Sequence, residues 1–219
     1  MPTRFRVLLF DLEGTLVDFQ WNLLGAARDA KYKLHRLGFD PSTWEDNYAT
    51  LRNNAVLSAI QRGIARREVI DRIDAIYDRY DQDAASRWRV LPSVKPTLSR
   101  LKKEHEIKMA LVSNIGRRTV NEMLPRLELA EFFNVVITRN DVEMMKPNAE
   151  GIGIALEKLG ASKSETLFIG DSVTDVLSAK EAGVQVAIVQ GGESAPTSLI
   201  AAAPTFLWKS MSELEALYL

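Results

Sequence analysis

The 219-residue chain contains no cysteine, which excludes disulfide bonds and thiolate metal sites. It also has no excess of charge of either sign, since 28 Lys and Arg residues face 29 Asp and Glu residues and the net charge is −1. This balance gives no electrostatic reason to expect nucleic acid or an anionic membrane as a partner. The remaining composition, 46% hydrophobic and 26% charged, is typical of a globular protein.

Long apolar runs are also missing. No stretch approaches the ~18 residues that a membrane-spanning helix needs. The N-terminal apolar run is short and ends at Asp11, so it does not resemble a signal peptide. We therefore expect a cytoplasmic protein that acts away from membranes. Nothing in the sequence indicates an assembly, and a monomer is the default expectation.

The spacing of apolar residues changes twice along the chain. Residues 17–88 contain almost no strand-like segment, and their apolar residues recur at helical spacing. We expect helices there that end at Gly38, run from Pro41 to a break at Gly63, and cover residues 66–80. The tryptophans of this block, Trp21, Trp44 and Trp88, are expected to pack within it. Arg52 and Asn53 could face a neighbouring crevice.

From residue 89 onward, strands and helices alternate, which predicts a parallel sheet covered on both faces. The expected strands cover residues 107–112, 133–138, 166–169, 185–189 and, at an edge, 206–208. The expected helices end near residue 105 or cover residues 117–127, 149–159, 173–182 and 211–219. A buried strand also precedes the helical block. The sequence thus predicts an α/β, Rossmann-like core of residues 1–16 and 89–219, interrupted by an all-helical cap of residues 17–88.

Polar and charged side chains follow four of the predicted strands. In chain order they are Asp11, Glu13 and Thr15; Ser113 and Asn114; Lys146; and Asp171 and Asp175. Because the carboxyl ends of parallel strands share one edge of a sheet, we expect these groups to meet in one crevice. Each group alone also has an ordinary interpretation, so the prediction of a site depends on their convergence.

The first group suggests an attack on phosphate. Asp11 leaves a wholly apolar strand, which suits a nucleophile with limited hydration, although a strand can also simply end in a polar residue. Glu13 could protonate a leaving oxygen and then activate water, or it could be an exposed turn residue. Gly14 lets the backbone turn tightly, and Thr15 offers a hydroxyl to a phosphate oxygen.

The other strand ends could hold the phosphate and a metal. Ser113 and Asn114 precede a helix, where they could bind phosphate or only cap that helix. Lys146 could neutralise a phosphate and a nucleophile, or be one of many surface lysines. Asp171 and Asp175 offer the carboxylate oxygens that Mg²⁺ prefers, or they could be a helix cap and a first-turn acid.

Together these segments resemble the haloacid dehalogenase superfamily, in particular its Mg²⁺-dependent phosphatases with a helical cap inserted after the first motif. The resemblance covers nearly the whole chain and rests on four motifs in the family's order: residues 11–18 (DLEGTLVD), 111–114 (LVSN), 146–147 (KP) and 170–175 (GDSVTD). Residues 179–183 (AKEAG) are similar to the phosphoglycolate phosphatase branch.

The resemblance implies a role for each matching residue. Asp11 would be the nucleophile that forms an aspartyl-phosphate, and Glu13 the general acid and base. The phosphoryl group would be bound by Thr15, Ser113, Asn114 and Lys146. Mg²⁺ would be held by Asp11, Asp171 and the main-chain carbonyl of Glu13, with support from Asp175. The helical insertion would be a mobile cap that selects a small phosphorylated metabolite.

One residue departs from the pattern of the phosphatases, which usually carry Asp where this chain has Glu13. Enolase-phosphatases resemble this chain in having Glu there. The extra methylene moves the carboxyl group by roughly one bond length, about 1.5 Å. Because small displacements of a catalytic group can cost large rate factors, this position bears directly on the rate or on the choice of leaving group.

Two other functions fit parts of the same pattern. A 2-haloacid dehalogenase would use Asp11 to displace halide without a metal, which leaves Asp171, Asp175 and Glu13 without a purpose. A phospho-acceptor or binding protein of low activity would also combine an Asp, a Ser or Thr and a Lys around Mg²⁺. The chain length and the helical insertion oppose this interpretation.

Overall fold

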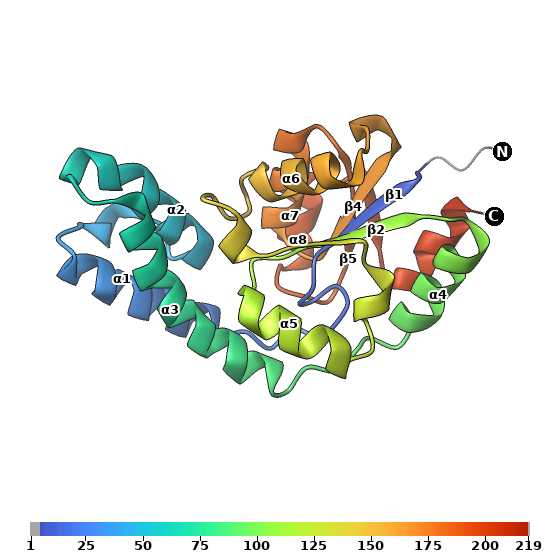
Figure 1. The fold of residues 1–219 in the computed structure, drawn as a ribbon, viewed down its shortest axis with the longest axis horizontal. Coiled ribbons are helices and arrows are strands. Elements are labelled where there is room, and N and C mark those ends of the chain that lie inside the picture. The colour runs from blue at the N-terminus through green and yellow to red at the C-terminus, as the bar shows by residue number, and fades with distance from the viewer. Residues whose placement is uncertain (1–4, 219) are drawn as a thin grey trace.

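The computed structural model describes residues 5–218, which contain a six-stranded, wholly parallel sheet in the order β3-β2-β1-β4-β5-β6 (Figure 1). The strands are β1 (Val7–Phe10), β2 (Lys108–Val112), β3 (Val135–Ile137), β4 (Thr166–Gly170), β5 (Gln185–Val189) and β6 (Phe206–Trp208). The strand β1 pairs with β2 on one side and with β4 on the other, so it lies in the middle of the sheet.

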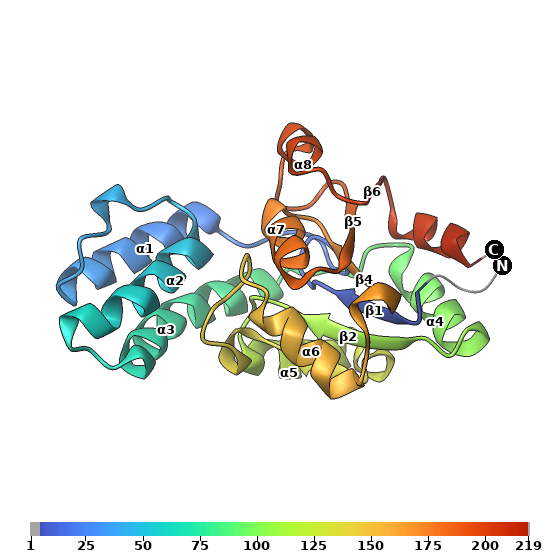
Figure 2. The same ribbon diagram turned by 90° about the horizontal axis from the view of Figure 1, so that it is seen from above.

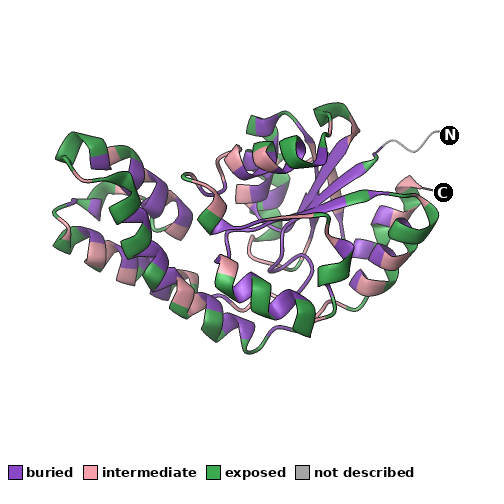
Figure 3. Ribbon diagram, viewed as in Figure 1, coloured by how far each residue is buried: buried purple, intermediate pink, exposed green. Residues whose placement is uncertain are grey.

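Helices cover both faces of this sheet (Figure 1). They are α4 (Val94–Glu104) and α5 (Arg117–Arg126) on one face, and α6 (Glu150–Leu159), α7 (Val173–Ala182) and α8 (Pro196–Ala202) on the other. Successive strand residues alternate between the faces, so Leu8 and Phe10 join the apolar cluster of α4 and α5, whereas Val7 and Leu9 join that of α6 and α7. This burial on both faces explains why the central strand β1 is buried and apolar throughout (Figure 3).

The helical insertion consists of α1 (Leu23–Arg36), α2 (Tyr48–Ala59) and α3 (Arg66–Ala85), which lie together to one side of the sheet (Figures 1 and 2). Short 3₁₀ turns occupy Pro41–Thr43 and Ile60–Arg62. The two connections to the core run side by side, because Val17 forms an antiparallel bridge with Val90. Both ends of the insertion are therefore joined to the core at one place.

The fold class predicted from the sequence is confirmed, with local corrections. The stretch expected to be one helix from Pro41 is a 3₁₀ turn and a separate helix, because the side chain of Asn47 accepts a hydrogen bond from the Thr50 amide and starts α2 afresh. The third helix of the insertion continues to Ala85 rather than ending at residue 80. Gly63 breaks the chain as expected, with a positive φ of 66°.

Other differences lie in the core. The strand expected at residues 133–138 is shorter, since β3 covers only Val135–Ile137. The helix α8 was not expected, and it buries only Leu199, too little for an apolar pattern to show. The helix expected at residues 211–219 is a 3₁₀ helix, Met211–Leu217, and Leu219 lies outside the described residues. Within residues 5–218, no helix has the length and hydropathy that crossing a bilayer requires.

Candidate active site

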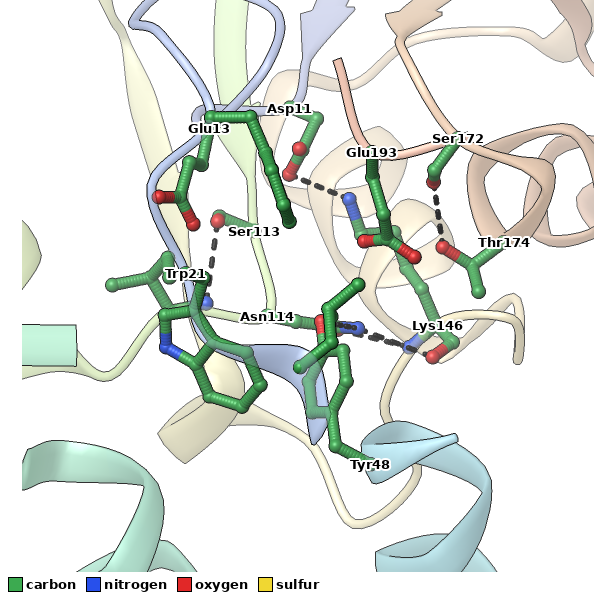
Figure 4. A pocket seen from close by; sticks show the side chains of 13 residues that line it. Asp11, Glu13, Trp21, Tyr48, Ser113, Asn114, Lys146, Ser172, Thr174 and Glu193 are labelled. Carbon is green, nitrogen blue, oxygen red and sulfur yellow. Dashed lines mark hydrogen bonds and ion pairs between the residues drawn. The ribbon is translucent and has the colours of Figure 1, made fainter. Parts of the chain in front are cut away.

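The predicted convergence of strand ends is present in the structure. In the register of the sheet, Phe10 pairs with Leu111 on β2 and with Ile169 on β4. The chain after each of these strands therefore emerges at the same edge, where Asp11, Ser113, Asn114 and Lys146 line one pocket (Figure 4). The insertion contributes the opposite wall of this pocket.

Lys146 lies at the centre of the charged groups. Its Nζ atom is 2.6 Å from Asp11 Oδ1 and 2.7 Å from Asp175 Oδ1, and its side chain is buried. Burial opposes the charge of the ammonium group, but Asp11 and Asp175 outweigh this effect and raise the pKa of Lys146 above its usual value. Lys146 therefore carries a permanent positive charge between two acids.

Asn114 positions the backbone that carries this lysine. The Lys146 amide donates to Asn114 Oδ1 over 3.1 Å, and Asn114 Nδ2 donates to the Lys146 carbonyl over 3.2 Å. The same Nδ2 group lies 3.3 Å from the hydroxyl of Tyr48 on the insertion. Neighbouring Ser113 is buried, and its Oγ atom accepts a hydrogen bond from the Ile115 amide. Both side chains face the pocket that Asp11 enters.

Three carboxylates gather beside the lysine, and each offers an oxygen within 4.8 Å of the others: Asp11, Asp171 and Asp175. Asp175 is fixed through Oδ2 by the amides of Asp171 and Ser172 and by the Ser172 hydroxyl. Asp171 accepts hydrogen bonds from the Glu193 amide at 2.5 Å and from Thr15 Oγ1 at 3.3 Å. Thr15 is fully buried and is thus held beside the acids.

Two glycines leave the room that Asp171 occupies. A Cβ atom at Gly14 or at Gly192 would collide with the carboxyl group of Asp171. Gly14 also has a φ of +82°, a conformation that side chains other than glycine disfavour. The glycine in the first motif is therefore needed both for the turn and for the close approach of the acid.

The triad has more negative charge than the lysine compensates. Burial, followed by the charge of Asp175, raises the pKa of Asp11 to about 6, against the partly compensating effect of Lys146. Burial and the charges of Asp175 and Asp11 also hold the pKa of Asp171 well above its usual value. Buried oxygens with uncompensated negative charge are the donor set that a hard divalent cation binds, so these residues fit a metal site.

Glu13 lies on the side of the pocket opposite Lys146 (Figure 4). Its Oε1 atom accepts hydrogen bonds from Trp88 Nε1 and from the Gln20 amide, both at 2.8 Å. Burial raises the pKa of Glu13 to about 8, although these two donors act against the shift. The carboxyl group is therefore mostly protonated at neutral pH and can give up a proton.

Several residues of the site were not predicted from the sequence. Trp88 was expected only to pack, but it also donates to Glu13. Trp21 and Tyr48 pack as an aromatic pair, with ring centroids 4.3 Å apart, and both line the pocket. Glu193 follows β5, and burial raises its pKa to about 7. The rule that polar residues after parallel strands share one edge could have found Glu193, whereas nothing in the sequence indicated the direction of the cap side chains.

Arg52 and Asn53 do not line this pocket. Asn53 exchanges two hydrogen bonds with the backbone of Met145, at 2.8 and 2.9 Å. Arg52 donates to the Glu143 carbonyl over 2.7 Å and pairs with Asp74 at the same distance. Arg52 and Asn53 on α2 therefore bind the loop that carries Lys146, whereas the aromatic residues Trp21 and Tyr48 line the pocket.

Residues 8–189 match the family model described as haloacid dehalogenase-like hydrolase. The match spans most of the chain, and the chain belongs to this family of hydrolases. The resemblance inferred from the four motifs is thereby confirmed.

Curated relatives extend over nearly the whole chain. A phosphoglycolate phosphatase of Photorhabdus laumondii is 28% identical over 216 residues, covering 95% of this chain and 90% of the relative. Phosphoglycolate phosphatase 1 of Pseudomonas aeruginosa is 30% identical over 217 residues, covering 95% of this chain and 78% of the relative.

Solved structures share the fold. A protein of Haemophilus somnus described as a predicted phosphoglycolate phosphatase has a TM-score of 0.71 at 21% identity, with full coverage of both chains. A haloacid dehalogenase-type hydrolase of Bacillus subtilis, bound to magnesium and described as showing interdomain movement, has a TM-score of 0.61 at 22% identity, covering 99% of this chain and 100% of that one.

Proposed function

We propose that this hydrolase cleaves small phosphate monoesters through an aspartyl-phosphate on Asp11. The observation that carries the proposal is the placement of Asp11: its Oδ1 atom lies 2.6 Å from a buried lysine, and two further acids stand beside it. The relatives named phosphoglycolate phosphatase support a phosphate ester as the substrate.

In the first step, a carboxylate oxygen of Asp11 bonds to phosphorus while the bond from phosphorus to the leaving oxygen breaks. Glu13 supplies the proton that this oxygen takes up, for which its raised pKa suits it. In the second step, the Glu13 carboxylate takes a proton from water, whose oxygen attacks phosphorus. Inorganic phosphate leaves, and Asp11 is regenerated as a carboxylate.

The remaining residues hold the phosphoryl group and its charge. We assign phosphate contacts to Ser113, Asn114 and Lys146, which line the pocket with Asp11, and to Thr15, which is buried beside Asp171. Asp11, Asp171 and Asp175 would hold Mg²⁺, which supplies positive charge for the phosphate oxygens when it is bound. The magnesium-bound relative supports this choice of metal. The main-chain carbonyl of Glu13 remains a predicted further ligand.

The helical insertion, residues 17–88, is assigned the role of a cap that excludes water and contacts the leaving group. Its Trp21 and Tyr48 already line the pocket, and its two connections meet at one place in the core. A cytoplasmic monomer without nucleic-acid or membrane partners stays the prediction from the sequence.

Release of phosphate from p-nitrophenyl phosphate tests this function. The assay compares wild type with Asp11→Asn, each with Mg²⁺ and with EDTA, and uses Asp71→Asn on the exposed face of α3 as the control. We expect Mg²⁺-dependent turnover by wild type and by the control, and a loss of about 10³-fold or more in Asp11→Asn. Turnover that survives EDTA or the Asp11 substitution would contradict the proposal; halide release from a 2-haloacid without metal would favour the dehalogenase alternative.

A further inference from the structure

The pocket around Asp11 is poor in positive charge. Among the described residues that line it, Lys146 is the one cation, and it already pairs with Asp11 and Asp175. The buried arginines near the pocket are also engaged, because Arg52 pairs with Asp74 and Arg139 pairs with Asp81. No cation in this lining is left to pair with a negative group on the leaving part of a substrate.

An acid faces the same space. Glu193 lines the pocket, and Figure 4 shows its carboxyl group directed into it, on the same side as Lys146 and Thr174. The Glu193 amide donates to Asp171, which fixes the backbone from which this side chain extends. The carboxyl group is therefore presented to the pocket by an anchored turn.

The wall that the insertion contributes carries no charge. Its lining residues are Phe19, Trp21, Leu23 and Tyr48. The Tyr48 hydroxyl accepts a hydrogen bond from Asn114 Nδ2, and the Trp21 Nε1 group donates to Asp81, so this wall offers polar atoms but no cation. Besides Glu13, the part of the substrate beyond the phosphate therefore meets aromatic faces, the Tyr48 hydroxyl and the carboxyl group of Glu193.

We propose that the pocket selects phosphate monoesters whose leaving group is uncharged or carries an ammonium group, and that it discriminates against leaving groups that carry a carboxylate. This inference rests on the proposed phosphatase function. It separates the chain from the relatives named phosphoglycolate phosphatase, because the leaving group of phosphoglycolate carries a carboxylate. A leaving-group carboxylate placed beside the Glu193 carboxyl group finds no free cation in this lining to pair with its charge, which is unfavourable.

Three esters of equal length test the inference: phosphoethanolamine, propyl phosphate and phosphoglycolate. They place an ammonium nitrogen, a methyl carbon and the carboxylate oxygens at the same number of bonds from the ester oxygen. We expect kcat/KM to fall in that order, with about a tenfold or larger difference between the first and the last. Equal values for the three esters, or a preference for phosphoglycolate, would overturn the inference while leaving the phosphatase function intact.

The variant Glu193→Gln tests which group causes the selection. It keeps the length of the side chain and the amide that binds Asp171, and the matched control is Glu157→Gln on the exposed face of α6. We expect Glu193→Gln to reduce the ratio of kcat/KM for phosphoethanolamine over phosphoglycolate by about threefold or more, and the control to leave it unchanged. An unchanged ratio in a folded Glu193→Gln protein would refute this role of Glu193.

Failure of the function itself gives a different result. If wild type with Mg²⁺ hydrolyses neither p-nitrophenyl phosphate nor any of the three esters, the proposed function is wrong and the inference falls with it. The proposed selection against phosphoglycolate is contradicted independently of the phosphatase function only when the protein hydrolyses at least one of the three esters.

Discussion

Two clusters of charged side chains are buried in this chain, and they are balanced differently. We call them the strand-end cluster (Asp11, Lys146, Asp171 and Asp175) and the interface cluster (Arg52, Asp74, Asp81 and Arg139). The first has three acids for one cation. The second has two acids for two arginines and joins the insertion to the loop after β3.

Most polar groups of the interface cluster have hydrogen-bond partners within the chain; the buried Arg139 Nε atom has none, although it lies 3.3 Å from Asp74 Oδ1. Asp81 accepts hydrogen bonds from Trp21 Nε1 at 2.9 Å, from the Gly116 amide at 2.8 Å and from Arg139 Nη2 at 3.0 Å. Burial opposes the charge of Arg139, but Asp81 and Asp74 outweigh it and raise its pKa above the usual value. In the strand-end cluster, burial and the neighbouring acids instead raise the pKa values of Asp11 and Asp171. Charge that is balanced holds the structure together, whereas uncompensated charge indicates a ligand.

Substituting an acid of the interface cluster should have the largest effect on stability. Asp81→Asn leaves the fully buried Arg139 with less compensation, and we expect the free energy of unfolding to fall by about 3–5 kcal/mol. Urea unfolding measures this change. Asp83→Asn, in an exposed pair two residues along α3, is the control and should cost less than about 0.5 kcal/mol. Similar effects of the two substitutions would show that the interface cluster is not structural.

Removing the one cation of the strand-end cluster should act on the rate. Lys146→Met leaves Asp11 and the phosphate without their shared positive charge, and we expect kcat to fall by about 10²–10³-fold. Steady-state hydrolysis of p-nitrophenyl phosphate with Mg²⁺ measures it. Lys158→Met, on the exposed face of α6, should be as active as wild type. A decrease in kcat of less than tenfold would contradict the proposed catalytic role of Lys146.

The same Asp-to-Asn change should have the opposite sign in the strand-end cluster. The pKa of Asp11 is raised to about 6, so its ionised form destabilises the metal-free fold, and this cost grows as the pH rises from about 4 to 6. We expect Asp11→Asn to stabilise the EDTA-treated protein at pH 7 by about 1–3 kcal/mol. Thermal unfolding in EDTA measures it. Destabilisation by Asp11→Asn would mean that the charge of Asp11 is compensated within the chain, as the charge of Asp81 is.

The smallest expected effect concerns the proton of Glu13. Because its pKa is about 8, we expect kcat to fall as the pH rises through 8 and the acid loses its proton. Trp88→Phe removes a hydrogen-bond donor that favours the carboxylate of Glu13, so the decrease in kcat should occur at higher pH. We also expect kcat to fall by about tenfold, because Glu13 is positioned less well. Trp208→Phe, buried on β6, is the control. An unchanged pH dependence of kcat in Trp88→Phe would show that Trp88 does not influence the pKa of Glu13.

The comparison also explains what could be predicted from the sequence. The strand-end cluster was predicted, because the period of the strands and their parallel order bring Asp11, Asp171 and Lys146 to one edge whatever the details of packing. The arrangement of the four strand ends thus followed from topology alone. Glu193 follows the same rule, but the Gly191-Gly192 pair before it indicates only a turn in the sequence.

The residues of the insertion could not be placed in the same way. The pairing of Arg139 with Asp81, and the contact of Trp88 with Glu13, join segments 58 and 75 residues apart. Such contacts depend on how α3 rotates and where it docks, which helical periodicity does not determine. The short helix α8 escaped detection for a related reason, since a single buried residue sets no period.

The most direct test of the account is to find the covalent intermediate. Wild type mixed with p-nitrophenyl phosphate and Mg²⁺, quenched in acid within the first turnover and digested, should yield a peptide containing Asp11 with the added mass of one phosphoryl group. The same peptide from Asp11→Asn should be unmodified. A phosphoryl group on another residue, or rapid turnover by wild type with no modified peptide at any quench time, would contradict the assignment of Asp11 as the nucleophile.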